Sequence, residues 1–81
     1  MIKREFKIGS ALKSRRKELH LTQTQVADRA GIILQQYQKM ETDERDIMNA
    51  SFYIACRIIE ALEWNVSDFF NEYKDKTVDK E

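Results

Sequence analysis

The chain contains no proline and only two glycines, Gly9 and Gly31, in 81 residues. Sheets depend on turns built largely from glycine, proline and small polar residues, and a chain this poor in glycine and proline offers few of them. Apolar residues instead recur three and four positions apart, which is the spacing of one helix face. The sequence therefore predicts an all-α protein, and we expect a compact bundle of five helices.

The composition fits a single globular domain. Hydrophobic residues make up 42% of the chain and charged residues 35%, a balance that is not typical of disorder. A chain of this length buries only about 60% of the surface that its unfolded form exposes, so the core must be small. No apolar run approaches the roughly 20 residues of a membrane helix. The opening residues MIKREFKIGS lack the apolar segment of a signal peptide, and we expect a cytoplasmic protein with no membrane partner.

Residues that could support catalysis or metal binding are scarce. Cys56 is the only cysteine and His20 the only histidine, so they provide neither a disulfide framework nor a zinc site. A catalytic pair would need Cys56, on an apolar helix, to meet His20, in the turn after the first helix. We expect Cys56 to be a small buried hydrophobe. The sequence predicts no enzyme activity, no metal, no cofactor and no small-molecule ligand.

Two helices are expected before Gly31. The first covers about 6–19, and its apolar face consists of Ile8, Leu12 and Leu19. Thr22 is suited to cap the second helix, with Gln25 as its capping-box partner three residues later. Gly31 ends that helix because glycine tolerates the left-handed conformation of a C-terminal cap.

The third helix is expected at about 34–41. Its inward stripe consists of Ile33, Tyr37 and Met40, at positions i, i+4 and i+7. Because each residue turns a helix by about 100°, Gln35 and Lys39 lie on the opposite face. The spacing thus predicts a polar helix face that points away from the core.

A polar connection then leads to two further helices. The fourth covers about 51–62, and we expect it to bury Phe52, Ala55, Ile58, Ile59 and Leu62. Asn65 and Asp68 form a capping-box-like pair at the start of the fifth helix. The apolar stripe of that helix consists of Val66, Phe69, Phe70 and Tyr73. One domain would therefore span 1–73, followed by a frayed polar tail at 74–81.

The formal net charge of zero hides a division between the two parts of the chain. Residues 1–45 carry ten basic and six acidic residues, a net charge of +4, and the remainder carries four basic and eight acidic residues, a net charge of −4. This asymmetry indicates an anionic partner for the first part. A solvated mixture of surface charges is the alternative.

Three segments of the chain, LKSRRKELHLTQTQVADRAG, QQYQKME and IACRIIEALEWNVSDFF, follow one another in this order. Together they resemble the phage repressor and Cro-type helix-turn-helix family, also called the xenobiotic-response-element family, over about residues 8–70. The most specific parts are LTQ at 21–23, the spacing from Ala27 to Gly31, and Glu41 at the end of the third helix. The resemblance implies a lambda-repressor-like DNA-binding fold in which the second and third helices form the helix-turn-helix.

Residues 33–63 depart from the family pattern at several positions. Ile33 stands where Ser or Thr usually caps the recognition helix, and Leu34 stands where a polar residue often faces the bases. The connection TDERDIMNA has three acids among its first five residues, and these would repel phosphate. Glu63 stands where a glycine often ends the fourth helix, so we expect either a mildly strained cap or a different helix ending.

The function implied by the resemblance is sequence-specific binding of double-stranded DNA by a transcriptional regulator, with the helix at 34–41 in the major groove. Base contacts are expected from Gln35, Gln36, Lys39 and Leu34. Glutamine can both donate and accept, as N6 and N7 of adenine require, and lysine suits guanine or a phosphate. Leu34 could contact a thymine methyl group or could pack in the protein.

Contacts to the DNA backbone are expected from a second set of residues: Gln23, Lys13, Arg15, Gln38 and Arg45. Gln23 falls at the start of the second helix, where the free N–H groups and the positive dipole end favour phosphate. The resemblance also implies a partly buried structural ion pair between Arg16 and Glu41.

Two functional interpretations follow. The first is a repressor that acts as a homodimer through its C-terminal helices, because the fifth helix has a wide apolar face. The second is an antitoxin-like or partner-binding regulator with the same fold, which the zero net charge keeps open. A solvated helix face remains the simplest alternative for QQYQK alone.

Overall fold

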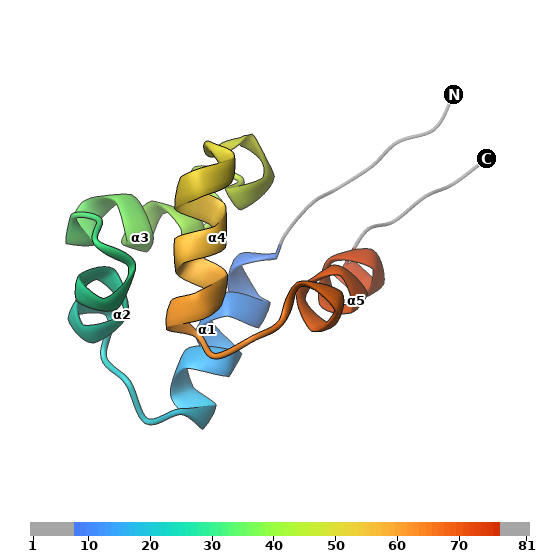
Figure 1. The fold of residues 1–81 in the computed structure, drawn as a ribbon, viewed down its shortest axis with the longest axis horizontal. Coiled ribbons are helices and arrows are strands. Elements are labelled where there is room, and N and C mark those ends of the chain that lie inside the picture. Colours follow the sequence, from blue (N-terminus) through green and yellow to red (C-terminus); the bar gives the residue numbers. More distant parts are fainter. Residues whose placement is uncertain (1–7, 77–81) are drawn as a thin grey trace.

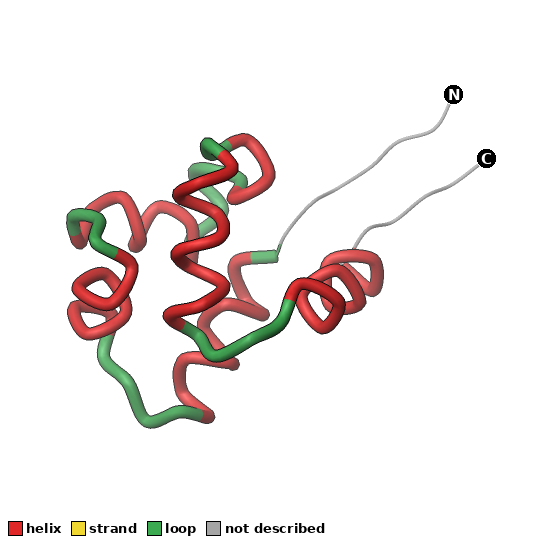
Figure 2. Tube along the Cα trace, viewed as in Figure 1, coloured by secondary structure: helices red, strands yellow, loops and turns green. Residues whose placement is uncertain are grey.

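The computed structural model describes the backbone of residues 8–76 and side chains up to residue 72. This part of the chain contains helices and no strand, as Figures 1 and 2 show. The elements are α1 (Gly9–Glu18), α2 (Gln23–Ala30), α3 (Leu34–Glu41), the 3₁₀ helix η1 (Ile47–Asn49), α4 (Phe52–Ala61) and α5 (Val66–Lys76). The expected all-α fold with five α-helices is confirmed, and the start of the first helix expected at residues 6 and 7 lies outside the described residues.

Helix α4 runs through the middle of the molecule (Figure 1). Helix α2 packs against both α3 and α4, and α3 also contacts α1. Helix α5 lies on the other side of α4 from the α2–α3 pair (Figure 1). The α2–α3 pair and α5 therefore form separate surfaces on opposite sides of α4.

One core joins all five helices and η1. Its largest fully buried side chains are Tyr37, Phe69, Ile8, Leu12, Met40, Ile47, Ile58, Leu62 and Val26. The connection after α3 was expected to be simply polar, but it contains η1 and sends Ile47 into this core. Within the described residues, no helix is both long enough and apolar enough to cross a membrane.

The prediction that Ile33 and Phe52 lie in the core is wrong. Ile33 is 62% exposed and Phe52 is 84% exposed. Ile33 precedes α3 with an extended backbone (φ −78°, ψ 153°), so the helical spacing that pointed it inward does not apply to it. Phe52 is the first residue of α4, where the helix extends past the buried part of the core.

Local capping signals set three helix ends as the sequence predicts. Thr22 Oγ1 accepts from the Gln25 backbone N–H at 3.1 Å, and Gln25 Oε1 accepts from the Thr22 backbone N–H at 2.8 Å. Gly31 has φ +73° and ends α2 in the left-handed conformation. Asn65 Oδ1 accepts from the Asp68 backbone N–H at 2.8 Å at the start of α5. The expected caps of α2 and α5 are present.

Two acidic residues take backbone conformations that side chains rarely adopt. Glu63, after α4, has φ +56°, and Asp43, after α3, has φ +65°. Of the two alternatives expected at Glu63, a strained cap or a different helix ending, the strained cap is the one present. Asp43 Oδ1 accepts a hydrogen bond from the Gly9 backbone N–H at 2.9 Å, so this acid caps α1 from the far side of the sequence. Asp46, another of the three acids expected to repel phosphate, also has a structural partner, because its Oδ1 accepts from the Met48 backbone N–H at the start of η1.

Helix α5 continues to Lys76, past the domain boundary expected at residue 73. Phe69 is buried, whereas Val66 is 51% exposed and Phe70 is 44% exposed. The apolar stripe of α5 is therefore only partly covered. The side chain of Tyr73 and residues 77–81 of the expected tail lie outside the described residues.

Candidate nucleic-acid interface

The α2–turn–α3 unit is closed by the backbone of the turn. The Gly31 N–H donates to the Asp28 carbonyl at 3.2 Å, and the Ile32 N–H donates to the Ala27 carbonyl at 3.0 Å. Three residues, 31–33, then separate the two helices. This geometry sets α3 across α2, because the chain must reverse within a turn that only a left-handed residue such as Gly31 fits comfortably.

The outer face of α3 is polar, as predicted. Gln35, Gln36 and Lys39 are exposed, while Tyr37 and Met40 are buried beneath them. Gln38 is half-buried on the side that faces the start of α2. Leu34 is also half-buried, so part of its side chain packs in the protein and part remains available.

A shallow polar hollow of about 360 Å³ lies where the outer face of α3 meets α2 and the following loop. It is lined by Gln23, Gln35, Gln38, Lys39, Thr42 and Glu44. The structure thus brings together three residues expected at bases or backbone with Gln23 from the start of α2.

The ion pair between Arg16 and Glu41 is present and buried. Arg16 Nε donates to Glu41 Oε2 at 2.6 Å and Arg16 Nη2 donates to Oε1 at 3.2 Å. The side chains are only 10% and 3% exposed. Arg16 also donates from Nη1 to the Leu21 carbonyl at 2.9 Å. The pair joins α1 to the C-terminal end of α3 and fixes the distance between them.

The carboxylate of Glu41 is held in its charged form. Burial by itself would raise the pKa of Glu41. Hydrogen bonds from Arg16 and Gln23 oppose this effect, and the polar Tyr37 hydroxyl nearby also favours the charged carboxylate. Together they outweigh burial, so the pKa of Glu41 lies below its usual value. Burial, followed by the charge of Glu41, raises the pKa of Tyr37, which keeps the phenol neutral. The Tyr37 hydroxyl makes no hydrogen bond of good geometry with any described residue.

Gln23 extends this pair into a chain of four side chains. Gln23 Nε2 donates to Glu41 Oε1 at 2.9 Å, and Gln38 Nε2 donates to Gln23 Oε1 at 3.1 Å. The chain links α1, α2 and α3. Sequence reasoning placed Gln23 and Gln38 at the DNA backbone and missed their bond to each other, because the two residues are brought together only by the turn.

A family model described as helix-turn-helix matches residues 12–63, more than half of the chain and including α2, the turn and α3. The chain belongs to the helix-turn-helix family. The resemblance seen in the sequence is therefore confirmed, and the protein is a DNA-binding regulator of this kind. No curated protein sequence matches the chain closely enough to count as a relative.

The same helix-turn-helix arrangement occurs in a solved structure, that of the clp gene regulator ClgR from C. glutamicum. The two structures align with a TM-score of 0.71 over 84% of each chain, at 20% sequence identity. The likeness shows a shared fold.

Arg15 makes hydrogen bonds within the protein that the sequence did not indicate, and its expected contact with the DNA backbone stays a prediction. Arg15 Nε donates to the Leu62 carbonyl and Nη2 to the Glu63 carbonyl, both at 2.9 Å. Its guanidinium carbon lies 6.0 Å from the ring centre of Trp64. Arg15 is therefore engaged at the C-terminal end of α4, where free carbonyls and the negative dipole end attract a cation.

Helices α2 and α4 each provide an arginine that caps the C-terminal end of the other helix. The sequence did not indicate either contact. Arg57 of α4 donates from Nε to the Ala30 carbonyl and from Nη2 to the Arg29 carbonyl, at the end of α2. Arg29 of α2 donates from Nη1 to the Ala61 carbonyl, at the end of α4, and to Glu63. By contrast, Lys13 and Arg45 are exposed, and they remain candidates for phosphate contact beside the helix-turn-helix.

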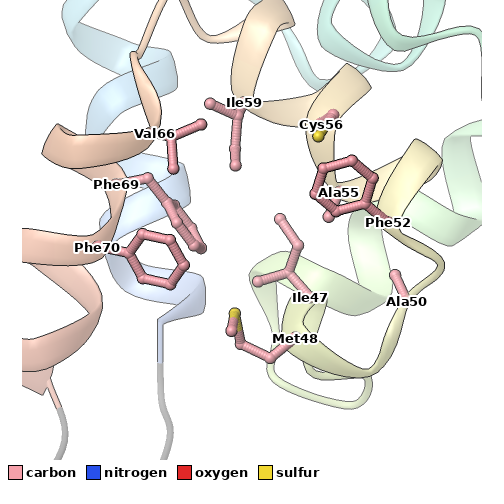
Figure 3. A pocket seen from close by; sticks show the side chains of 10 residues that line it. All are labelled: Ile47, Met48, Ala50, Phe52, Ala55, Cys56, Ile59, Val66, Phe69 and Phe70. Carbon is pink, nitrogen blue, oxygen red and sulfur yellow. The ribbon is translucent and has the colours of Figure 1, made fainter.

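An apolar groove lies away from the helix-turn-helix, between η1, α4 and α5. It has a volume of about 220 Å³ and is lined by Ile47, Met48, Ala50, Phe52, Ala55, Cys56, Ile59, Val66, Phe69 and Phe70. Figure 3 shows these side chains surrounding an open centre, with Phe52 on one side and Phe69 and Phe70 on the other. Cys56 is half-buried at this groove rather than fully buried as expected.

Proposed function

We propose that this protein is a transcriptional repressor that binds a specific double-stranded DNA sequence with α3 in the major groove. The outer face of α3 carries the proposal. Gln35, Gln36 and Lys39 are exposed there, and no other described residue engages their side chains by a hydrogen bond or ion pair. A helix fits the major groove, and helix-turn-helix proteins present the N-terminal part of their second helix to base edges.

The position of each side chain along α3 suggests its role. Gln35 and Gln36 lie in the first turn of the helix and are the stronger candidates for base contact. Lys39 lies one turn further on and would meet either a guanine or a phosphate. The exposed part of Leu34 suits a thymine methyl group.

Contacts to the DNA backbone would come from the residues that border this face. Lys13 is exposed on α1, three positions before Arg16, whose side chain reaches the end of α3. Arg45 is exposed in the loop after α3. Gln23 begins α2, where helix N–H groups and the positive dipole end favour a phosphate. These side chains would hold the protein on the duplex without selecting its sequence.

The experiment is selection of bound duplexes from a random library, followed by affinity measurements at several salt concentrations. The wild-type protein is expected to enrich one sequence and to lose affinity steeply as salt rises. Gln35→Ala should weaken the preference at particular base pairs by about 1 to 3 kcal/mol and leave the salt slope nearly unchanged. If Gln35→Ala, Gln36→Ala and Lys39→Ala together change neither the selected sequence nor the affinity, α3 is not the recognition helix.

The same proposal includes a homodimer formed through α4 and α5. Monomeric proteins rarely leave large apolar patches open, yet Phe52, Val66 and Phe70 are all substantially exposed around the apolar groove. An apolar cavity of about 150 Å³ admits benzene, so the groove has room for one aromatic ring. In a two-fold dimer, Phe52 of each copy would enter the groove of the other. Two half-sites would then lie about 34 Å apart on the DNA.

A partner-binding or antitoxin-like regulator is the second candidate, and the same apolar groove favours it if the protein is monomeric. The two candidates differ in solution. A dimer in sedimentation at micromolar concentration, together with salt-sensitive binding to duplex, supports the repressor. A monomer that binds duplex weakly and without sequence preference supports a regulator whose groove holds a different protein.

A further inference from the structure

The hydrogen-bonded chain from Arg16 to Gln38 has a fixed direction. Glu41 is ionised, and a carboxylate can only accept hydrogen bonds. The Gln23 atom that lies 2.9 Å from Glu41 Oε1 must therefore be the donor, Nε2. The amide of Gln23 cannot be turned over without placing its oxygen against the carboxylate.

The orientation of the Gln23 amide in turn fixes which atom of Gln38 can bond to it. With Nε2 of Gln23 at Glu41, the Oε1 atom of Gln23 faces Gln38 at 3.1 Å. That oxygen can only accept, so Gln38 must present its own Nε2 to it. The charge of Glu41, at the end of α3, thus determines which way the amide of Gln38 points.

Gln38 lines the polar hollow that Gln35 and Lys39 also line. The Oε1 atom and one N–H of Gln38 are not used by any described residue. A freely rotating glutamine can turn its amide to suit a donor or an acceptor. Gln38 has lost that freedom, and its carbonyl oxygen is the atom that turns away from Gln23.

We propose that Gln38 is a base-contacting residue that selects adenine, and that Glu41 sets its orientation through Gln23. Adenine presents the N6 amino donor and the N7 acceptor in the major groove, whereas guanine presents only acceptors there. An amide held with its oxygen outward and one N–H beside it matches adenine and disfavours guanine. Gln23 is a positioning residue in this scheme. The inference rests on the proposed function and changes the expected role of Gln38 from backbone to base contact.

The test compares the wild-type protein with Gln38→Ala, Gln23→Ala and the double variant. Each is used in selection from the random library and then in binding to the selected duplex and its single-base variants. Gln38→Ala should lower the preference for adenine over guanine at one position by roughly 5- to 100-fold. Gln23→Ala should lower the same preference at the same position. The double variant should lose no more than the larger single loss, because both changes remove one contact.

Modified DNA and a matched glutamine complete the test. Replacing that adenine by 7-deazaadenine, which lacks N7, should weaken binding of the wild type and leave binding of Gln38→Ala unchanged. Gln35→Ala serves as the control, since Gln35 lies in the same hollow with no bond to Gln23, and its effect should add to that of Gln23→Ala. Melting curves for each variant establish that it is folded at the temperature of the binding assay.

Several outcomes would overturn the inference. A uniform loss for all duplexes in Gln38→Ala, with a salt slope reduced by about one, would make Gln38 a phosphate contact. A preference lost in Gln38→Ala but kept in Gln23→Ala would show that Gln23 does not orient it. In both cases the wild type still selects a sequence, so the proposed function stands. A wild type that selects no duplex defeats the proposed function and this inference together.

Discussion

Gly9 lies directly against Met40, so that a Cβ atom on Gly9 would be 2.7 Å from the Met40 carbonyl oxygen. The carbonyl group of Glu41 is close to the same point. Because these neighbours are backbone atoms at the end of α3, they cannot move aside as the end of a flexible side chain could. The contact, together with the bond from the Gly9 N–H to Asp43, sets the start of α1 on the end of α3.

Gly9→Ala should therefore destabilise the protein by about 1 to 3 kcal/mol or more, as overpacking does elsewhere. Urea denaturation measures the free energy of unfolding. Ser10→Ala is the matched control, because Ser10 is the next residue of α1 and is exposed. A Gly9→Ala variant as stable as Ser10→Ala would contradict the close contact.

Glu41→Ala should cost about 3 to 5 kcal/mol, since it leaves the buried guanidinium of Arg16 without its partner. Glu44→Ala, three residues away and exposed, should change stability by less than about 0.5 kcal/mol. Melting temperatures of the two variants make the comparison. Small and equal shifts in both would mean that the Arg16–Glu41 pair contributes little.

Acid should unfold the protein partly through Glu41. Its pKa is lowered in the folded state, so the unfolded chain binds the proton more readily. The resulting stabilisation is fully present above the ordinary pKa of a glutamate, 4.5, and is lost as the pH falls through the lower, folded value. Denaturation followed from about pH 7 to about pH 3 should show a weaker pH dependence in Glu41→Gln than in Glu44→Gln. Equal pH dependence would assign the acid sensitivity to other groups.

Lys13→Ala should affect DNA binding and Arg15→Ala should affect stability, although the two residues are only two positions apart. Lys13→Ala should weaken binding to all duplexes and reduce the salt slope by about one, with little loss of stability. Arg15→Ala should cost about 1 to 2 kcal/mol of stability, because the Leu62 and Glu63 carbonyls lose a charged donor. Its salt slope should match the wild type. A reduced slope in Arg15→Ala would show that Arg15 contacts the DNA backbone as well.

If the proposed homodimer forms, Phe52→Glu should shift it to monomer by placing a charge in the apolar groove of the partner copy. The folded monomer should keep its melting temperature within a few degrees, because Phe52 is 84% exposed. Tyr53→Glu is the control, since Tyr53 is the next residue of α4, is 68% exposed and does not line the groove. Sedimentation velocity distinguishes the two. Identical dimerisation in both variants would exclude Phe52 from the interface.

The sequence predicts those features that depend on neighbouring residues. The caps at Thr22 and Gly31 follow local rules, and the bounds of α3 agree with the expected 34–41. Ile33 was misplaced because it precedes α3 with an extended backbone, and Phe52 was misplaced because helical spacing does not indicate where a helix leaves the core. The Arg16–Glu41 pair came from the family resemblance, since the spacing of two residues 25 positions apart carries no such information.

Hydrogen bonds between residues that are far apart in the sequence could not be predicted for the same reason. Arg15 and Glu63 are 48 positions apart in the chain, and Arg29 and Ala61 are 32 apart. A basic residue near a helix end is a general signal, but nothing local shows which helix end it will close. The bond between Gln23 and Gln38 likewise depends on how the turn at 31–33 sets α3 against α2.

The arginines that close helix ends also alter how a polyanion would encounter this protein. Random duplex is held by cations that displace condensed counterions, and Arg15, Arg29 and Arg57 are largely committed to carbonyl groups of the protein itself. Among the side chains that the structure describes, four basic ones remain exposed without such a bond and could hold random duplex: Lys13, Lys17, Lys39 and Arg45. Because the three arginines are engaged within the protein, visits to random DNA should be shorter than if they were free, so that the search for a target would rely more on short collisions and less on long one-dimensional sliding.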